Sequence, residues 1–546
     1  MAVALGAWAA AAQTSLYPIE KTMNGANDFI GCDGYGAPTP EGDGMIHFAM
    51  TLGIFNTPGE GNTMRQTALT GPAGVAACDQ AIPAVPPQHW RRVVSLLLAR
   101  AVHDLEARDA KAALADLDKA EAAARDPADA FYARSLGLDL DSMRAYALRQ
   151  TGEAAAARAL ALKTLDARPW RKRAPQAAVV VLSSSADEDT LASLLRRGAA
   201  LDPRGLDGLF NFDLAKGRFA EAALIHPSLV MPLLPEPTGY PAQVEQEKRV
   251  IGALYWMNRD SQYAYALAAL GRADEARAAI ADARQRFEAQ TQNPVDPLPP
   301  KVAARRMMEI NDNNRARAIG EPSLTRYDAL VKARLLAADG HPEEALQTIA
   351  PLSKDVLWLD VAKAASPSPN RTNPPPPVIV VPTGVDKLVT AFWKNDLPEA
   401  EARERLPSET RAGAAIAAAW SGASPHPVRD GPAPEPGAVS IKTHPQRGPT
   451  MDMVGEMVLL RAAELAHEQN KKGMVVLRRE EINHILNTFV YGRQVRSDPT
   501  GFESDMDVLF VDPGALPAAY AATPWRVLDV DAILASLTPV YRRPAA

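Results

Sequence analysis

The sequence predicts a mainly α protein built of antiparallel helix pairs, with a loop-rich N-terminal cap and a small C-terminal α+β module. The middle of the chain is rich in Ala, Leu, Arg, Glu and Asp at helical spacing, and short turn-forming pairs such as "TG" and "GR" interrupt it. Residues 14–89 are rich in Gly, Thr, Asn and Pro and are expected to form the cap, with short helices at Met45–Ile54 and Pro72–Ala81. Hydrophobic residues make up 47% of the 546, which permits substantial buried cores.

The N-terminus, "MAVALGAWAAAAQTSLYP", combines a run of small apolar residues with an A-x-A pattern before Gln13. The run is too short to span a bilayer, and it resembles the apolar region and cleavage site of a secretory signal without the positive residues that usually precede them. Two interpretations stay open. Residues 1–13 are a signal peptide of a periplasmic or otherwise exported protein, or they are an apolar helical arm of a cytoplasmic one.

The chain has two cysteines, Cys32 and Cys78, and both lie in the cap. In an exported protein such a pair favours a disulfide, which would stabilise the fold by about 4 kcal/mol in the chain-entropy treatment of loop closure. The first alternative is a nucleophilic cysteine assisted by His47 or His89. The second is a pair of unrelated buried thiols.

Small and apolar residues recur at fixed distances from several turns in the region 90–355, including the stretch "GRADEARAAI" that starts at Gly271. A glycine ends a helix in the left-handed conformation without steric cost, and small residues beside it let two helices approach closely. The matching residues are Ala264, Leu267, Ala276, Ile280 and Ala283 around Gly271; Ala145, Leu148 and Ala157 around Gly152; Ala333, Leu336, Ala345 and Ile349 around Gly340; Ala101, Ala113, Leu117 and Ala120 around Arg108; and Ala222 alone near Gly217.

This pattern resembles the tetratricopeptide repeat (TPR), a helix-turn-helix unit of about 34 residues, in degenerate copies that cover 90–355. The resemblance implies a TPR-like α-solenoid whose first helices line a concave groove, whereas the alternative is a generic helical bundle. Tyr and Arg are the residue types that most often anchor interfaces, although any single one can equally be a packing or solvated residue. The candidate groove contacts on the first helices are Tyr146, Arg149, Asn258, Ser261, Tyr265, Tyr327 and Arg334.

Proline-rich stretches divide the C-terminal part of the chain. We expect a Pro-rich linker at 366–385, a short helical segment at 386–422, a Pro/Gly-rich linker at 424–449 and the α+β module at 450–546. In the module, the sequence predicts an amphipathic helix, then strands at "GMVVLRR", "NTFVYGRQVR" and "DMDVLFVD" in a three-stranded antiparallel sheet, and a final helix at "DVDAILASLT". Two spacers on its N-terminal side predict that the module is mechanically separate.

The stretch "LLRAAELAHEQNKKGMVVL" in this module faintly resembles a helix-to-strand element of certain alphaproteobacterial envelope lipoprotein domains. In this sequence Asn470-Lys471-Lys472-Gly473 stands where those domains have a Gly-Tyr-Asp-type turn, and no lipid-bearing cysteine lies near the N-terminus. The resemblance covers about 90 residues and implies no activity.

The sequence has no phosphate-binding loop, serine-hydrolase elbow or zinc-protease motif, so we predict no catalytic residue and no cofactor. "GCDGYG" lacks the flanking strand and helix of a dinucleotide-binding fingerprint, and the scattered histidines, His484 among them, do not predict zinc. An acidic set in the last predicted strand region could supply calcium ligands but lacks the spacing of an EF-hand, so an exposed acidic edge is the simpler interpretation and no metal is predicted. That set is Asp498, Glu503, Asp505, Asp507 and Asp512.

These features predict a non-catalytic protein- or peptide-binding scaffold of the cell envelope that uses a concave groove. The net charge of −6, with no basic block, disfavours nucleic acid, and no apolar run is long enough for a membrane span. Two alternatives stay open. One is an enzyme or ligand-binding activity in the C-terminal module, built from His484, the acidic set and Arg493 or Arg496, and the other is a structural subunit of an envelope complex. The sequence does not identify the partner or the oligomeric state.

Overall fold

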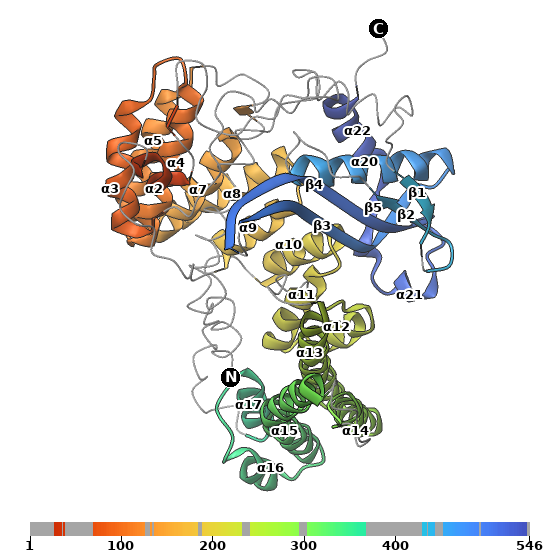
Figure 1. The fold of residues 1–546 in the computed structure, drawn as a ribbon. Helices are drawn as coiled ribbons and strands as arrows, with labels where there is room; N and C mark the ends of the chain where they lie inside the picture. The colour runs from red at the N-terminus through yellow and green to blue at the C-terminus, as the bar shows by residue number, and fades with distance from the viewer. Residues whose placement is uncertain are drawn as a thin grey trace. The chain divides into compact units, whose positions relative to one another are not determined.

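The computed structural model divides into two compact units, described separately here (Figure 1). Unit 1 contains Met1–Asp202 and Val380–Ala546, and unit 2 contains Pro203–Ile379, so unit 2 interrupts unit 1 in sequence. The described residues are mainly helical with one antiparallel sheet in the C-terminal part, as predicted. The structure describes residues 27–34, 37–38, 69–125, 132–133, 136–183, 188–231, 241–293, 303–366, 429–433, 435–442, 451–490 and 493–542.

The N-terminal part of unit 1 is helical. It begins with a pair of helices joined by the Cys32–Cys78 disulfide, and further helix pairs follow along the chain. The predicted helix at Pro72–Ala81 is confirmed, whereas the one at Met45–Ile54 lies outside the described residues. The helices are α2 (Asn27–Asp33), α3 (Gly71–Ala81), η1 (Ile82–Ala84), α4 (Trp90–Glu106), α5 (Ala110–Ala123), α7 (Leu136–Thr151), α8 (Ala154–Ala167), α9 (Arg173–Leu182) and α10 (Glu188–Leu201).

Unit 2 consists of helices in its described residues. Two of them are long: α13 has 29 residues and α15 has 36. The last helix in the described part of the unit is the short α17. The helices are α11 (Gly205–Ala215), α12 (Phe219–Ile225), η2 (His226–Ser228), α13 (Pro241–Ala269), α14 (Ala273–Gln290), α15 (Ala303–Ala338), α16 (Pro342–Ile349) and α17 (Val356–Ala364).

Five helix pairs share one turn geometry: α4–α5, α7–α8, α11–α12, α13–α14 and α15–α16. A residue with positive φ ends the first helix of each pair: Arg108, Gly152, Gly217, Gly271 and Gly340. In every turn, the amide of the residue after the left-handed one donates to the carbonyl of the residue five positions before it, at 2.8–2.9 Å. This bond closes the first helix in the manner of a Schellman motif. The five turn positions chosen from the sequence are therefore confirmed, including the one at Gly217, where only Ala222 matched the pattern.

Each of these turns is followed by a buried alanine at a fixed position. The alanine amide donates to the carbonyl of the residue that follows the left-handed position, so it closes the first turn of the second helix. A larger side chain would separate the two helices, because little space is left between close-packed elements. These alanines are Ala113, Ala157, Ala222, Ala276 and Ala345, and none is more than 1% exposed.

The sheet of unit 1 has five strands in the order β1-β2-β4-β3-β5, and all neighbouring strands are antiparallel. β3 and β4 form one long hairpin, with Gly473 opposite Val511 at its base and Val490 opposite Arg493 at its far end. The elements of this part are β1 (Arg429–Pro432), β2 (Ala438–Lys442), α20 (Met451–Glu468), β3 (Gly473–Val490), β4 (Arg493–Val511), α21 (Ala518–Ala521), η4 (Pro524–Arg526), β5 (Val527–Asp529) and α22 (Val530–Tyr541).

The prediction of three strands was wrong in three ways, the first being that the three-residue strand β5 was not predicted. Two strands, β1 and β2, lie in the segment 424–449 that was interpreted as a linker, because strands of four or five residues are too short to give a strong alternating pattern. "GMVVLRR" and the start of "NTFVYGRQVR" belong to a single strand, β3. The predicted helices at the start and end of the module are confirmed as α20 and α22.

The C-terminal module shares a core with the N-terminal helices of unit 1, which differs from the expected mechanical separation. Leu201 at the end of α10 packs with buried residues of α20, the sheet and α22, and Trp170 packs against the same cluster. α20 is buried over most of its circumference, so an amphipathic interpretation underestimated its burial. It lies between the strands and α22 and contacts both.

Charged side chains join the same two parts of unit 1. Arg168, in the connection from α8 to α9, donates from Nε and from a terminal nitrogen to the two carboxylate oxygens of Glu456, both at 3.0 Å, and both side chains are 1% exposed. Arg171 pairs with Asp452 at 2.7 Å, and Lys172 pairs with Glu481 at 2.9 Å. Because buried charges are tolerated only when paired, these contacts fix the module to the helices.

Several predicted segments lie outside the described residues: residues 1–13, the linker 366–385 beyond Ser366, and the helical segment 386–422. Among the described helices, none is both long enough and apolar enough to span a bilayer.

Candidate binding surfaces

The cysteines of the cap form a disulfide, Cys32–Cys78, with Cα atoms 4.7 Å apart. Both are buried among Phe29, Ala77 and Leu96, so neither is a free nucleophile and the disulfide interpretation is confirmed. The polar contacts around the disulfide also tie the cap to α4: His103 Nε2 lies 2.8 Å from the carbonyl oxygen of Cys32.

A pair of carboxylates lies between α4 and α5. Asp104 is 7% exposed and Asp116 is 4% exposed, and Arg100 donates to both oxygens of Asp116 at 2.5 and 2.7 Å. Burial, together with the charge and hydrogen bond of Asp116, raises the pKa of Asp104 to about 7. Asp104 therefore holds a proton up to neutral pH.

The seven predicted groove residues are divided between the two units. Two belong to unit 1, where Tyr146 is 3% exposed and Arg149 donates to the carbonyl of Val180 on α9 at 2.5 Å. The Arg149 contact joins α7 to α9, and Tyr146 is buried within the same unit. The prediction assigned them to an open groove because the sequence does not show that α9 would cover this face.

The other five belong to unit 2, and two of them bond within their own helix. Asn258 donates to the carbonyl of Leu254 at 2.9 Å, and Ser261 donates to that of Met257 at 2.7 Å and has no exposed surface. The position of Ser261 excludes contact with a ligand in this conformation.

The remaining three lie at the surface formed by the first helices α11, α13 and α15, and two of them contact α17. The hydroxyl of Tyr265 donates to Asp360 Oδ2 at 2.7 Å, and Arg334 Nε lies 3.2 Å from the same oxygen. Tyr327 is 8% exposed. Two of the predicted groove residues therefore contact α17 of the same chain, a contact that the sequence did not indicate.

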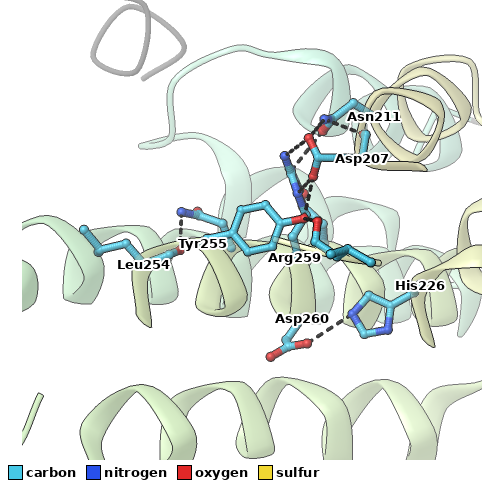
Figure 2. Close-up of polar contacts among 10 residues, drawn as sticks. Asp207, Asn211, His226, Leu254, Tyr255, Arg259 and Asp260 are labelled. Carbon is cyan, nitrogen blue, oxygen red and sulfur yellow. Dashed lines mark hydrogen bonds and ion pairs between the residues drawn. The ribbon is translucent and has the colours of Figure 1, made fainter. Parts of the chain in front are cut away.

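A polar network continues along these helices, centred on Arg259 of α13 (Figure 2). Arg259 Nε and a terminal nitrogen contact the two oxygens of Asp207 at 2.6 and 2.9 Å, and its other terminal nitrogen donates to Asn211 at 3.0 Å. Both partners lie on α11. A bidentate guanidinium–carboxylate contact fixes both planes, so this network holds α11 and α13 in register.

Tyr255 completes the network, since its hydroxyl donates to Asp207 Oδ1 at 2.8 Å. Burial raises the pKa of Tyr255, and the charge of Asp207 adds to the effect, so the phenol stays protonated throughout the physiological range. Burial likewise raises the pKa of Tyr327 on α15. We call the surface made by these first helices the first-helix face; its residues are Asp207, Asn211, Tyr255, Arg259, Gln262, Tyr265, Tyr327 and Arg334. Sequence reasoning missed Asp207 and Arg259. Their opposite charges, on the first helices of successive helix pairs, could have indicated that the two residues form an ion pair.

A cleft of about 380 Å³ lies between η2, α13 and α14. In it, Asp260 is 3% exposed and lies 3.1 Å from His226 Nε2 and 3.0 Å from a terminal nitrogen of Arg286 (Figure 2 shows the histidine contact). The imidazole stacks on Tyr263 with ring centres 4.2 Å apart. A His–Asp pair orients an imidazole for proton transfer, but none of the residues that line this cleft carries the hydroxyl or thiol that such a pair would activate.

A larger groove of about 540 Å³ lies between α14 and α15. Its apolar lining includes Ile280, Val331 and Leu335, and its polar lining carries charges of both signs. Arg284 of α14 lies 3.6 Å from Asp328 of α15, and the two side chains are 39% and 58% exposed. An apolar floor with a charged rim is the usual composition of a surface that binds a protein segment.

Comparison of the chain with protein-family models, with curated proteins and with solved structures finds no match.

Asp505 and Asp507 of the acidic set do not lie on an exposed edge. β4 lies between β2 and β3, and Asp505 and Asp507 are each 5% exposed. Arg478 Nε contacts Asp507 at 2.7 Å, and Lys442 contacts Asp505 at 3.3 Å, so cross-strand pairing compensates both charges. The prediction failed because β2 was not recognised as the neighbouring strand. Within the described residues, no three His, Cys, Asp or Glu side chains gather as metal ligands would.

The catalytic constellation considered for this module is spread along the hairpin. His484 pairs in register with Gly501, Arg496 with Thr488, and Arg493 with Val490 at the far end. A strand rises about 3.3 Å per residue, so Arg493 and Asp505 lie roughly 40 Å apart along β4. Arg493 and Asp505 therefore do not lie at one site, whereas the register places His484 within a few residues of Asp498 and Glu503.

Proposed function

We propose that this chain is a non-catalytic protein-binding scaffold of the cell envelope, built of TPR-type helix pairs, and that the groove between α14 and α15 holds a segment of the partner. The groove is the observation on which the proposal rests. It is open, it has an apolar floor, and its rim carries charges of both signs.

The composition of the groove favours a protein segment over a small polar metabolite. Leu336 is partly exposed above the buried Val331 and Leu335 of α15, while Arg284 and Asp328 form only an exposed ion pair across the groove. Exposed pairs contribute little stability, so a partner can replace this one with its own charged groups at small cost.

The five helix pairs with one turn geometry support a repeat architecture. Each repeats a left-handed turn residue and a buried alanine at the same spacing, which is the arrangement expected of stacked helix-turn-helix units. Stacked pairs leave surfaces between successive units, and the α14–α15 groove lies between the second helix of one pair and the first helix of the next.

The disulfide supports the assignment to the cell envelope, because such bonds persist in oxidising compartments and are rare in reducing ones. Fractionation of the source cells tests this assignment. We expect the chain in the periplasmic fraction with Cys32 and Cys78 protected from alkylation, and a cytoplasmic chain with two free thiols would contradict it.

Site-specific photocrosslinking in the source cells tests the groove. A benzoylphenylalanine at Lys332, which is exposed and lines the groove, should crosslink to a partner, whereas one at the exposed Gln347 of α16 should not. Ala281→Arg places a bulky side chain in the groove and should abolish the crosslink. Ala278→Arg is the matched control, because it adds the same side chain to an exposed position of α14 outside the groove lining.

Equal crosslinking in the Ala281→Arg and Ala278→Arg backgrounds would overturn the proposal. A groove-dependent crosslink to a second copy of this chain would replace it with the assembly-subunit alternative.

A further inference from the structure

The contacts of α17 with the first-helix face resemble those of a bound peptide. α17 has nine residues, of which only Leu357 and Val361 are buried, one helical turn apart on one face. It contacts α11, α15 and α16, and Tyr265 of α13 reaches it through its hydroxyl. A single-faced short helix seated across several other helices is the geometry of helix-in-groove recognition.

Polar contacts fix the direction and register of α17. Its N-cap residue, Asp355, accepts from the amide of Trp358 and pairs with Arg326 of α15. One turn further along, Asp360 accepts from Tyr265, whose hydroxyl also lies 3.2 Å from the carbonyl oxygen of Leu357. Arg334 of α15 approaches the same carboxylate.

The charges of the two surfaces are complementary. The first-helix face presents Arg334 and the phenol of Tyr265, the adjacent Arg326 of α15 adds a second cation, and α17 presents Asp355 and Asp360. Arg326 and Arg334 are 16% and 18% exposed, so water still reaches them while α17 is in place. Tyr265 is wholly buried under these contacts.

We propose that the first-helix face is a second binding site of this chain, which binds a helix and which α17 occupies in cis. The partner helix that it accepts is amphipathic. It has an acidic N-cap, an acidic residue five positions later, and apolar residues at the positions of Leu357 and Val361. Displacement of α17 makes the site available, so α17 regulates binding. This proposal deepens the proposed scaffold function and rests on it, but it uses a surface different from the α14–α15 groove.

Release of α17 in the full chain tests this proposal. Val361→Asp places a charge at a position with no exposed surface and should release α17, whereas Leu359→Asp changes a 36% exposed position of the same helix and should leave it docked. Tyr265→Phe keeps the buried ring and removes the hydroxyl, so it should loosen α17 without changing the core. Hydrogen exchange should rise at least tenfold at 356–364 in Val361→Asp and Tyr265→Phe, and remain unchanged in α13 and α15.

A labelled peptide, SKDVLWLDVAKAAS, which is the sequence of residues 353–366, then serves as the partner helix. By fluorescence anisotropy it should bind the Val361→Asp chain at least tenfold more tightly than the wild type, and the same peptide carrying D360K should not bind. Absence of peptide binding to the released chain overturns the proposal. Loss of protection in α13 and α15 together with α17 also overturns it, because α17 would then be part of the core. Failure of the Lys332 crosslink leaves this outcome unaffected, so the two proposals fail separately.

Discussion

At the scale of single residues, the type of a side chain was easier to predict than its surroundings. Tyr265 and Arg334 were chosen because tyrosine and arginine often anchor interfaces, and both contact a helix across a surface. Ser261, four residues before Tyr265, was chosen on the same helix but bonds to its own backbone. The packing of α11, α15 and α17 determines which face of α13 is covered. The sequence of α13 alone does not predict where those helices lie.

The same limit applies to charged residues. Asp104 and Asp116 lie twelve positions apart and look like ordinary helix-surface acids, yet both are buried where α4 packs on α5. Their proximity follows from the turn at Arg108, which brings the two helices together.

We expect Asp104 to make the stability of unit 1 depend on pH. Its pKa in the folded chain is about 7, above its usual value of 3.8, so between these values the folded state holds a proton that the unfolded state has lost. The free energy of unfolding should therefore fall as the pH rises from 5 to 8, because the second carboxylate ionises beside Asp116. Asp104→Asn, which cannot ionise, should show a smaller fall in denaturant titrations at these pH values.

Asp118→Asn is the control, because its carboxylate is 67% exposed and pairs with Arg144 at the surface. Its pH profile should match that of the wild type. A profile for Asp104→Asn that also matches the wild type would show that Asp104 is already ionised at pH 5.

At the scale of elements, turns were predicted well and short strands were not. A turn that needs a left-handed residue can be recognised from the local sequence, because glycine occupies four of the five positions. Arg108 adopts the same conformation, and its helix pair was found only from the spacing of the alanines around it. A strand such as β2 has β1 as a near neighbour in sequence on one side, but on the other side it pairs with β4, more than 60 residues away, and its own sequence does not indicate this pairing.

Alanine substitution of two glycines in unit 2 separates turn geometry from helix propensity. Gly271→Ala should destabilise the α13–α14 pair by about 1 kcal/mol, because φ is +75° and no atom lies within 4 Å of the new Cβ, so backbone strain is the only cost. Gly208→Ala, within α11 and equally unobstructed, should stabilise α11 by about 0.5–1 kcal/mol.

Native-state hydrogen exchange over α11–α14 measures both effects. Changes of the same sign at the two sites would mean that the left-handed turn is not required in solution.

At the scale of the whole molecule, the proline-rich segments predicted that the C-terminal module would be separate from the helices before it. In the structure, the module and the N-terminal helices of unit 1 share a hydrophobic core. Arg168 and Glu456, 288 residues apart, form a buried bidentate pair. Burial raises the pKa of Glu481, but the charges of Arg479 and Lys172 outweigh burial and lower this pKa overall. Proline composition describes only the connection between two segments. It contains no information on whether the connected segments return to pack on each other.

Removal of one member of the buried pair should be costly. Arg168→Met removes the cation that pairs with the buried Glu456, which keeps its hydrogen bond from Tyr541, and should destabilise unit 1 by about 3–5 kcal/mol. The double change with Glu456→Leu should recover most of this loss. Arg277→Ala is the control: its pair with Asp274 is 59% and 99% exposed, and the effect should stay within about 0.5 kcal/mol.

Hydrogen exchange should show α8, α9 and α20 opening together in Arg168→Met. If α20 alone loses protection, the C-terminal module unfolds independently and the two parts are not one cooperative unit.

The interruption of unit 1 by unit 2 has a consequence for biosynthesis. The ribosome makes Arg168, Arg171 and Trp170 long before α20, and at about 5–20 residues per second the 288 residues to Glu456 take on the order of 15–60 s. During this interval the nascent chain exposes cations and apolar surface whose partners do not yet exist, while unit 2 is already complete. We therefore expect the nascent chain to depend on a chaperone that shields this surface, and a chain truncated before α20 to aggregate even though its N-terminal helices are intact.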